Sequence, residues 1–160
     1  MSAALIVETA RGWIGTPYLH QASLKGKGCD CLGLLTGVWR ELGGPQLDIP
    51  AYSMGWGEAT GAEVMVERMR PHLTEIAVAA MEPGDVAVFR MRMNCPAKHC
   101  GIVAERGGAV TVIHARARRA VAEEEMGREL TRRIAHVFRV PGDLQAQTPG
   151  DLQAQTPELF

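Results

Sequence analysis

The chain has 160 residues, of which 46% are hydrophobic and 22% are charged, and its formal net charge at pH 7 is −1. This length and composition are typical of one soluble domain with a substantial core. The near-neutral charge gives no reason to expect nucleic acid or an anionic membrane as a partner, and no segment approaches the roughly 20 apolar residues of a membrane span.

The first residues predict a helix. Ser2 is a suitable N-cap, the helical pattern continues to about Ile14, and Gly15-Thr16-Pro17 predicts its end. The segment lacks the basic start of a secretory signal and its apolar run is interrupted at Glu8, so we expect a protein made in the cytoplasm with reduced thiols. Residues 18–28 are expected to form a loop.

A second helix is predicted directly after this loop, and it begins at a cysteine. Asp30 is its predicted N-cap, which places Cys31 in the first turn. The backbone N–H groups and the helix dipole there favour a thiolate, so Cys31 is a candidate nucleophile. The apolar residues at helical spacing are Leu32, Leu34, Leu35, Val38, Trp39 and Leu42, and Gly43-Gly44-Pro45 predicts the end.

The chain changes from helices to strands at the turn signature Pro83-Gly84-Asp85. Before it, the capping-box spacing of Thr60 to Glu63 predicts a helix to about Met69. Residues 118–133 are compatible with either a surface helix or an extended insertion. Strands are predicted at 86–89, 99–105, 109–115 and 134–140. Helices followed by antiparallel strands indicate an α+β fold.

Two histidines lie on the hairpin predicted around Arg106-Gly107-Gly108. With Arg106-Gly107 as the turn, paired residue numbers sum to 213 and His99 lies directly opposite His114; with Gly107-Gly108 the sum is 215 and the two become diagonal neighbours on one face. Either register lets one imidazole orient the other. A thiol nucleophile needs such an oriented imidazole to take its proton, so both histidines are candidate catalytic residues.

A zinc site is the competing interpretation of the same residues. Cys29, Cys31, Cys95, His99 and Cys100 supply enough sulfur and nitrogen ligands for one tetrahedral ion. However, the C-x-C spacing is not that of the usual zinc knuckle, and neighbouring residues on a strand point to opposite faces. Cys100 is expected to face the core instead, and we predict no metal.

Five short motifs occur in a specific order within residues 3–140. They are Thr16-Pro17-Tyr18, Asp30-Cys31-Leu32-Gly33, Pro83-Gly84-Asp85-Val86, His99-Cys100-Gly101-Ile102-Val103 and Ile113-His114-Ala115. In this order they resemble the NlpC-type papain-like cell-wall cysteine peptidases. The resemblance implies an α+β, papain-like fold in which N-terminal helices pack on an antiparallel β-sheet.

The resemblance also implies a role for each residue of the site. Cys31 corresponds to the nucleophile, His99 to the general base and acid, and His114 to the residue that orients His99. Tyr18 corresponds to a tyrosine near the oxyanion site, and Asp30 to an acidic residue able to meet an amino group of the substrate. The implied substrate is the peptide stem of peptidoglycan, cleaved without a metal or another cofactor.

The compact form without a signal and the short cysteine motif resemble the branch encoded with phage and gene-transfer-agent tail genes. This implies tail or baseplate proteins as partners and action in the periplasm of a target cell, after incorporation in a virion or a gene-transfer-agent tail. Leu32 departs from the serine that usually follows the nucleophile. The alternatives are a tail-assembly or structural protein with a vestigial site, and a related papain-like amidase or acyltransferase.

Residues 141–160 differ in kind from the rest. An octapeptide that begins at Pro141 recurs word for word from Pro149, and its Pro, Gln and Thr content is typical of a flexible tail. The sequence thus predicts a peptidase domain over residues 1–140 and a flexible tail over 141–160.

Overall fold

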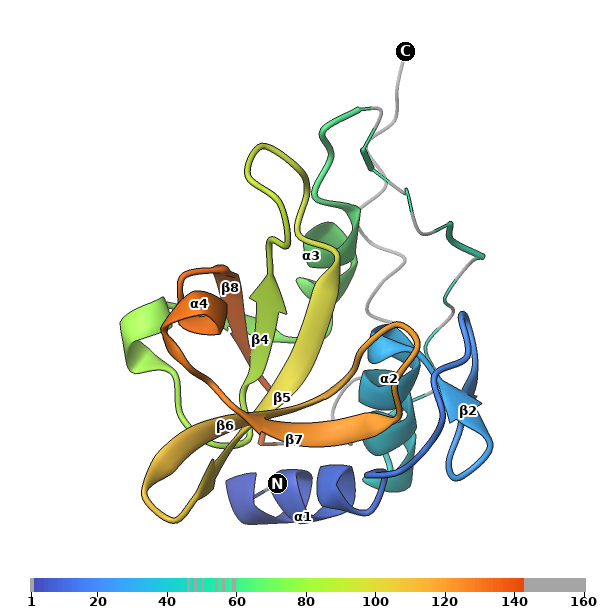
Figure 1. The fold of residues 1–160 in the computed structure, drawn as a ribbon, viewed down its shortest axis with the longest axis vertical. Helices are drawn as coiled ribbons and strands as arrows, with labels where there is room; N and C mark the ends of the chain where they lie inside the picture. Colours follow the sequence, from blue (N-terminus) through green and yellow to red (C-terminus); the bar gives the residue numbers. More distant parts are fainter. Residues whose placement is uncertain are drawn as a thin grey trace.

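The computed structural model describes residues 2–45, 47, 49, 51–53, 55, 57–58 and 60–142, and in it helices pack on one antiparallel sheet (Figure 1). This confirms the predicted α+β class. The helices are α1 (Ala3–Arg11), α2 (Cys31–Glu41), α3 (Val64–Met69), α4 (Arg128–Thr131) and the short 3₁₀ helix η1 (Val78–Ala80). The strands are β1 (Ser23–Leu24), β2 (Gly28–Cys29), β3 (Thr74–Ile76), β4 (Val86–Phe89), β5 (His99–Arg106), β6 (Ala109–Ala115), β7 (Val121–Glu125) and β8 (Ile134–Arg139).

The six-stranded sheet has the order β3-β8-β4-β5-β6-β7, and every neighbouring pair in it is antiparallel. The remaining strands, β1 and β2, pair from Ser23 to Cys29 as a small hairpin, almost all of it in the stretch 18–28 where only a loop was predicted. The turn residue Asp85 is buried beside the sheet and binds Arg139 of β8 through both carboxylate oxygens, each 2.9 Å from a guanidinium nitrogen. The motif Pro83-Gly84-Asp85 therefore ties the start of β4 to the end of β8.

Both predicted caps at the start of α1 and α2 are present. The Ser2 hydroxyl accepts a hydrogen bond from the Leu5 N–H, and the Asp30 carboxylate accepts one from the Gly33 N–H at 2.8 Å. Helix α1 ends at Arg11, earlier than predicted. The chain leaves the helix there because Trp13 turns into the core, where its indole N–H donates to Glu41.

The predicted capping box before α3 is wrong. The helix begins at Val64, and the preceding Glu63 makes no capping hydrogen bond. Its carboxylate instead accepts the Ala97 N–H at 2.7 Å and pairs with Arg90 at 2.6 Å. Glu63 therefore holds the loop before β5, a long-range contact that the local spacing could not indicate.

The β5–β6 hairpin has one of the two registers that the sequence left open. Ile102 pairs with Ile113, a sum of 215, so Gly107-Gly108 is the two-residue turn. Both glycines have positive φ, 62° and 81°, as a type I′ turn requires. In this register His99 and His114 are diagonal neighbours on one face of the sheet.

Residues 118–133 contain both an extended and a helical segment. Strand β7 pairs with β6 at the edge of the sheet, and the one-turn helix α4 follows it. Arg11 of α1 binds Glu123 of β7 at 2.9 Å and so ties the first helix to this edge. The duplicated octapeptide lies, from residue 143 on, outside the described residues, so the predicted tail stays a prediction.

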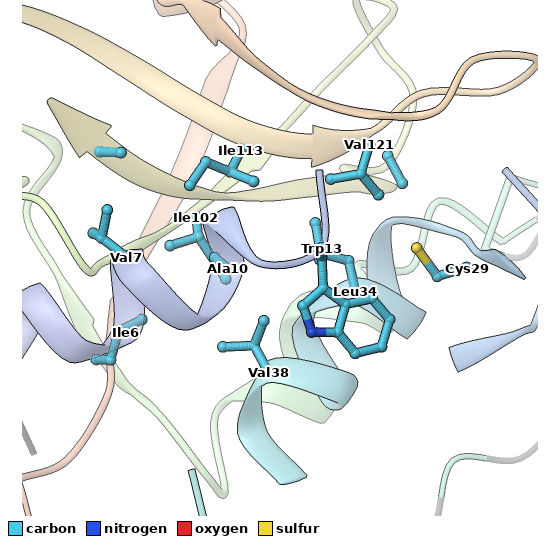
Figure 2. Packing of buried hydrophobic residues seen from close by; sticks show 12 residues of the cluster. Ile6, Val7, Ala10, Trp13, Cys29, Leu34, Val38, Ile102, Ile113 and Val121 are labelled. Atoms are coloured by element: carbon cyan, nitrogen blue, oxygen red, sulfur yellow. The ribbon is translucent and has the colours of Figure 1, made fainter. Parts of the chain in front are cut away.

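Helix α2 is the centre of the core. One of its sides meets α1 and strands β5 and β6, and Figure 2 shows Trp13 lying against α2 near Leu34 and Val38. Its other side meets α3, β4 and β8 through Leu32 and Trp39. The opposite face of the sheet carries a smaller apolar cluster that includes Phe89. Among the described helices, none combines the length and the apolar character that crossing a bilayer requires.

Candidate active site

Cys31 lies where the first turn of α2 meets the beginning of β5. The Sγ of Cys31 is 3.9 Å from the carbonyl oxygen of Lys98. The Sγ of Cys100 is 3.4 Å from the carbonyl oxygen of Cys31. Cys100 is fully buried and points to the helix side of the sheet, as predicted for a core residue. The half-buried nucleophile candidate therefore has a second thiol directly behind it.

The two histidines of the hairpin are in contact. His99 Nε2 is 2.9 Å from His114 Nδ1, so the second imidazole orients the first. The close approach depends on Gly101, which lies beside His114 just beyond the Ile102–Ile113 pair of the ladder. A Cβ at Gly101 would lie 2.9 Å from the Cβ of His114 and would push that ring away. With Nε2 of His99 bound to His114, its Nδ1 is the nitrogen left for the Cys31 thiol.

The electrostatics favour a thiolate at Cys31. Hydrogen bonds from the Cys100 thiol and from His99, together with the His99 charge, lower the pKa of Cys31 well below its ordinary value and outweigh the opposing effect of burial. The pKa of Cys100 is raised well above its ordinary value by its hydrogen bond to Cys31 and by burial. Of the two thiols, Cys31 is therefore the one that ionises more readily, and Cys100 stays protonated.

Asp30 is buried, and its carboxylate is engaged on both oxygens. One oxygen accepts the Gly33 N–H; the other accepts the Gln21 N–H at 2.7 Å and the Tyr52 hydroxyl at 2.6 Å, and lies 3.3 Å from His20 Nδ1. This arrangement favours a structural role in which Asp30 fixes the start of α2 and the loops beside it. The contact with a substrate amino group stays a prediction.

Tyr18 lies close enough to Cys31 to interact with a charge on that residue. Burial, followed by the charges of Asp30 and Cys31, raises the pKa of Tyr18. Its backbone is held by a parallel bridge to Cys29, in which the Cys29 N–H donates to Pro17 and the Leu19 N–H donates to the Cys29 carbonyl. The hydroxyl therefore remains protonated at neutral pH and able to donate a hydrogen bond.

The comparison with known proteins concerns the fold. No protein-family model and no curated protein matches this sequence. The fold is that of NlpC/p60 domains. The chain superimposes on the NlpC/p60 domain of the peptidoglycan hydrolase SagA with a TM-score of 0.60 and 21% identity, over 88% of this chain and 100% of that one. For an NlpC/p60 family protein from Bacillus cereus the TM-score is 0.61 and the identity 20%, over 88% of this chain and 40% of that one.

A third structure with this fold is an N-acetylmuramoyl-L-alanine amidase from Bacteroides uniformis. It matches with a TM-score of 0.56 and 12% identity, over 86% of this chain and 98% of that one. At such identities the likeness establishes the NlpC/p60-type fold, and the chemistry must be argued from the residues of the site.

The other cysteines lie apart from this chemistry. Cys29 is fully buried, and burial raises the pKa of its thiol to about 11. Cys95 lies in the loop before β5 and is partly exposed. Among the described residues, no three His, Cys, Asp or Glu side chains gather in a way that could hold a metal ion. His99 and Cys100 leave β5 on opposite faces, which is unsuited to a shared ligand set.

Sequence reasoning missed two groups next to the predicted site. Tyr52 binds Asp30 from a loop that carries no recognisable pattern, and its pKa is raised by burial and by that hydrogen bond. Glu124 on β7 has an oxygen 3.2 Å from His114 Nε2 and 3.0 Å from Arg116. The alternation of β7 could have placed Glu124 on the histidine face, had residues 118–133 been identified as a strand.

Replacing Cys100 with Ala is expected to raise the pH at which Cys31 becomes reactive by about one unit, since a hydrogen bond to a charged group is lost. The measurement is the pH dependence of iodoacetamide alkylation, with the modified residue located by mass spectrometry. Cys100→Ser retains a hydrogen-bond donor, so its alkylation midpoint is expected to stay near that of the unmodified protein. An unchanged midpoint in Cys100→Ala would show that Cys100 does not stabilise the thiolate.

His114 makes the stability of the fold depend on pH. Burial, and then the charge of His99, lowers the pKa of His114 to about 4, whereas an unfolded histidine has about 6.5. Between these values the unfolded chain binds a proton that the native chain does not. Stability therefore rises with pH across this window and is lost on acidification, by about 3 kcal/mol in total.

The pH effect is measured by urea unfolding of the unmodified protein and of His114→Gln at a series of pH values between 4 and 7. The difference between the two isolates the contribution of position 114, because all other groups titrate in both proteins. The variant is expected to lose less stability on acidification. If the free energy of unfolding changed with pH in the same way in both proteins, the neutral, buried state of His114 would be contradicted.

Proposed function

We propose that this chain is a cysteine peptidase that hydrolyses the peptide stems of peptidoglycan. The observation that carries the proposal is that Cys31 interacts with His99, and His99 with His114. Cys31 also lies at the start of a helix, and the pKa of its thiol is lowered. A thiolate paired with an oriented imidazole is the arrangement that acyl transfer by cysteine requires.

In the first half of the reaction, His99 holds the proton of Cys31 on Nδ1, and the thiolate attacks a stem-peptide carbonyl carbon. The oxyanion that forms would be stabilised by the backbone N–H of Cys31, which has no partner inside the helix, and by the Tyr18 hydroxyl. When the carbon–nitrogen bond breaks, His99 gives its proton to the leaving amine and a thioester to Cys31 remains.

In the second half, a water molecule loses a proton to His99 and attacks the thioester. Collapse of the second tetrahedral species releases the carboxylic acid and restores the Cys31–His99 pair. The thiolate, the base and the orienting residue are all supplied by this chain, so no step needs a cofactor.

Peptidoglycan is proposed as the substrate because one protein with this fold is named a peptidoglycan hydrolase and another an N-acetylmuramoyl-L-alanine amidase. The test is incubation with purified peptidoglycan, followed by mass spectrometry of the soluble products. Fragments with new amino and carboxyl ends within the stem peptide are expected. Complete absence of such fragments from several peptidoglycan types would refute the substrate class.

An amidase is the second candidate, favoured by the name of the Bacteroides uniformis neighbour. The same thiolate chemistry would then act on the amide between muramic acid and the first stem residue. Product analysis separates the two, since an amidase releases an intact stem peptide and a glycan strand free of peptide.

The proposal extends to where the enzyme works. The short motif Asp30-Cys31-Leu32-Gly33 supports a place in a phage-like or gene-transfer-agent tail, with residues 1–140 as the catalytic domain and 141–160 as a flexible tail. Leu32 packs in the core against the α3 side of α2, so its departure from the usual serine serves packing. Proteomic analysis of purified tail particles from the source organism tests this placement. Absence of the protein from the particles would refute a place in the tail.

A further inference from the structure

An acidic side chain continues the row of residues that begins at His99. In the β6–β7 ladder His114 pairs with Ala122 and Val112 pairs with Glu124, which makes His114 and Glu124 diagonal neighbours on one face. Glu124 Oε2 is 3.2 Å from His114 Nε2. Strands β5, β6 and β7 thus place His99, His114 and Glu124 side by side.

The contacts of His114 determine where its proton lies. Its side chain is 2% exposed, and burial keeps the ring neutral at neutral pH, so it carries one N–H. A carboxylate can only accept a hydrogen bond, so the N–H belongs on Nε2, facing Glu124. The lone pair of Nδ1 then faces His99 and must accept the N–H of His99 Nε2, 2.9 Å away.

We propose that Glu124 is a positioning residue that fixes the tautomer of His114 and, through it, directs Nδ1 of His99 toward the Cys31 thiol. This inference deepens the proposed cysteine chemistry and rests on it. Without the carboxylate, His114 is free to carry its proton on Nδ1 and to donate to His99 Nε2. A neutral His99 would then bear its proton on Nδ1, facing the thiol, and could not accept the Cys31 proton.

Arg116 completes the arrangement from the loop that follows β6. Its Nη1 is 3.0 Å from Glu124 Oε2, the same oxygen that faces His114. Against the effect of burial, the hydrogen bond from His114 and the charge of Arg116 hold the pKa of Glu124 below its usual range. Among the described residues, the charged or titratable groups that act on the pKa of His114 are His99 from β5, Glu124 from β7 and Arg116, and Arg128, Glu129 and Arg133 line the same hollow.

The experiment compares Glu124→Ala and Glu124→Gln with Glu125→Gln as a matched control. Glu125 is the next residue on β7 and is exposed, and it borders the same hollow; the alternation of a strand places its side chain on the face opposite that of Glu124. The first readout is the tautomer of His114, from the ¹⁵N chemical shifts of its ring. The second is the rate of Cys31 alkylation by iodoacetamide as a function of pH.

The unmodified protein is expected to show a neutral His114 protonated on Nε2. Glu124→Ala is expected to populate the Nδ1–H tautomer of His114. It is also expected to slow Cys31 alkylation at pH 7 about tenfold, because the interaction lost lies in strength between an exposed ion pair and a buried charge-assisted hydrogen bond. Glu124→Gln is expected to keep the tautomer, because its amide oxygen accepts the same N–H. Glu125→Gln is expected to change neither readout.

A His114 protonated on Nδ1 in the unmodified protein would overturn the inference. So would a Glu124→Ala variant with the original tautomer and alkylation profile. Neither measurement uses peptidoglycan, so failure to digest that polymer would refute the proposed substrate and leave the role of Glu124 intact. The Glu124 side chain is 31% exposed, and the spectrum of the unmodified protein alone tests the tautomer should a variant not fold.

Discussion

Replacing Cys31 with Ala is expected to abolish the release of stem-peptide fragments from peptidoglycan, by about 10⁴-fold or more, without unfolding the protein. The thiol is the group that would form the acyl intermediate, and its loss leaves only binding and oxyanion stabilisation. Cys31 is half-buried, and the cap of α2 is the hydrogen bond between Asp30 and the Gly33 N–H, so the smaller side chain leaves the helix and its cap in place. Fragment release is measured by mass spectrometry and the fold by circular dichroism and thermal unfolding.

The matched control for this variant is Cys95→Ala. Cys95 is also a free, partly exposed thiol, and the hydrogen bonds at that position use its backbone, whose carbonyl accepts from Arg90 and whose N–H donates to the Arg92 carbonyl. This variant is expected to keep full activity. Digestion by Cys31→Ala at the original rate would rule out Cys31 as the nucleophile. A folded, unmodified protein that digests nothing and whose Cys31 alkylates no faster than Cys29 would favour a vestigial site.

The second large effect is expected at the histidine pair. His99→Ala removes the group that holds and returns the proton, and a loss of about 10³-fold or more in kcat/KM is expected. His114→Gln is expected to be milder, at about 10- to 100-fold, because an amide oxygen can still accept the His99 N–H. The measurement is the steady-state rate on a soluble stem-peptide fragment.

His99→Ala is expected to lower kcat/KM more than His114→Gln does, and this order tests the two roles. A wholly active His114→Gln and His114→Ala would show that His99 needs no orienting partner. In contrast, a His99→Ala variant that retains most of its rate would place the base elsewhere. The matched control is His72→Ala, since this histidine lies just after α3, away from the contacts of Cys31.

Local patterns predicted the Asp30 cap of α2 and the contact between His99 and His114. Asp30 and Cys31 are adjacent, so a capped helix start could be identified from the spacing of α2 alone. The His99–His114 contact follows from the period of two in a strand and from a two-residue glycine turn, and the sequence left only two registers in which it could form. Where one short segment holds all the information, sequence reasoning suffices.

Contacts between distant segments could not be predicted in this way. The Tyr52–Asp30 hydrogen bond joins a loop without periodicity to a helix start. The capping box failed because Glu63 is used by the backbone of Ala97, far along the chain. Glu124 was missed because a charged run such as 121–125 fits an edge strand and a surface helix equally well, and only pairing with β6 decides between them.

The meeting of α2 with β5 has a consequence for the order of folding. Cys31 and Lys98, which are in contact, are 67 residues apart in the chain. An isolated cysteine near pH 7 is mostly a thiol, so the Cys31 of a nascent chain that has emerged only as far as β4 is nearly inert. The Cys31 thiol becomes reactive only when the β5–β6 hairpin docks on the helix, and the rate of alkylation during refolding therefore reports when that long-range contact forms.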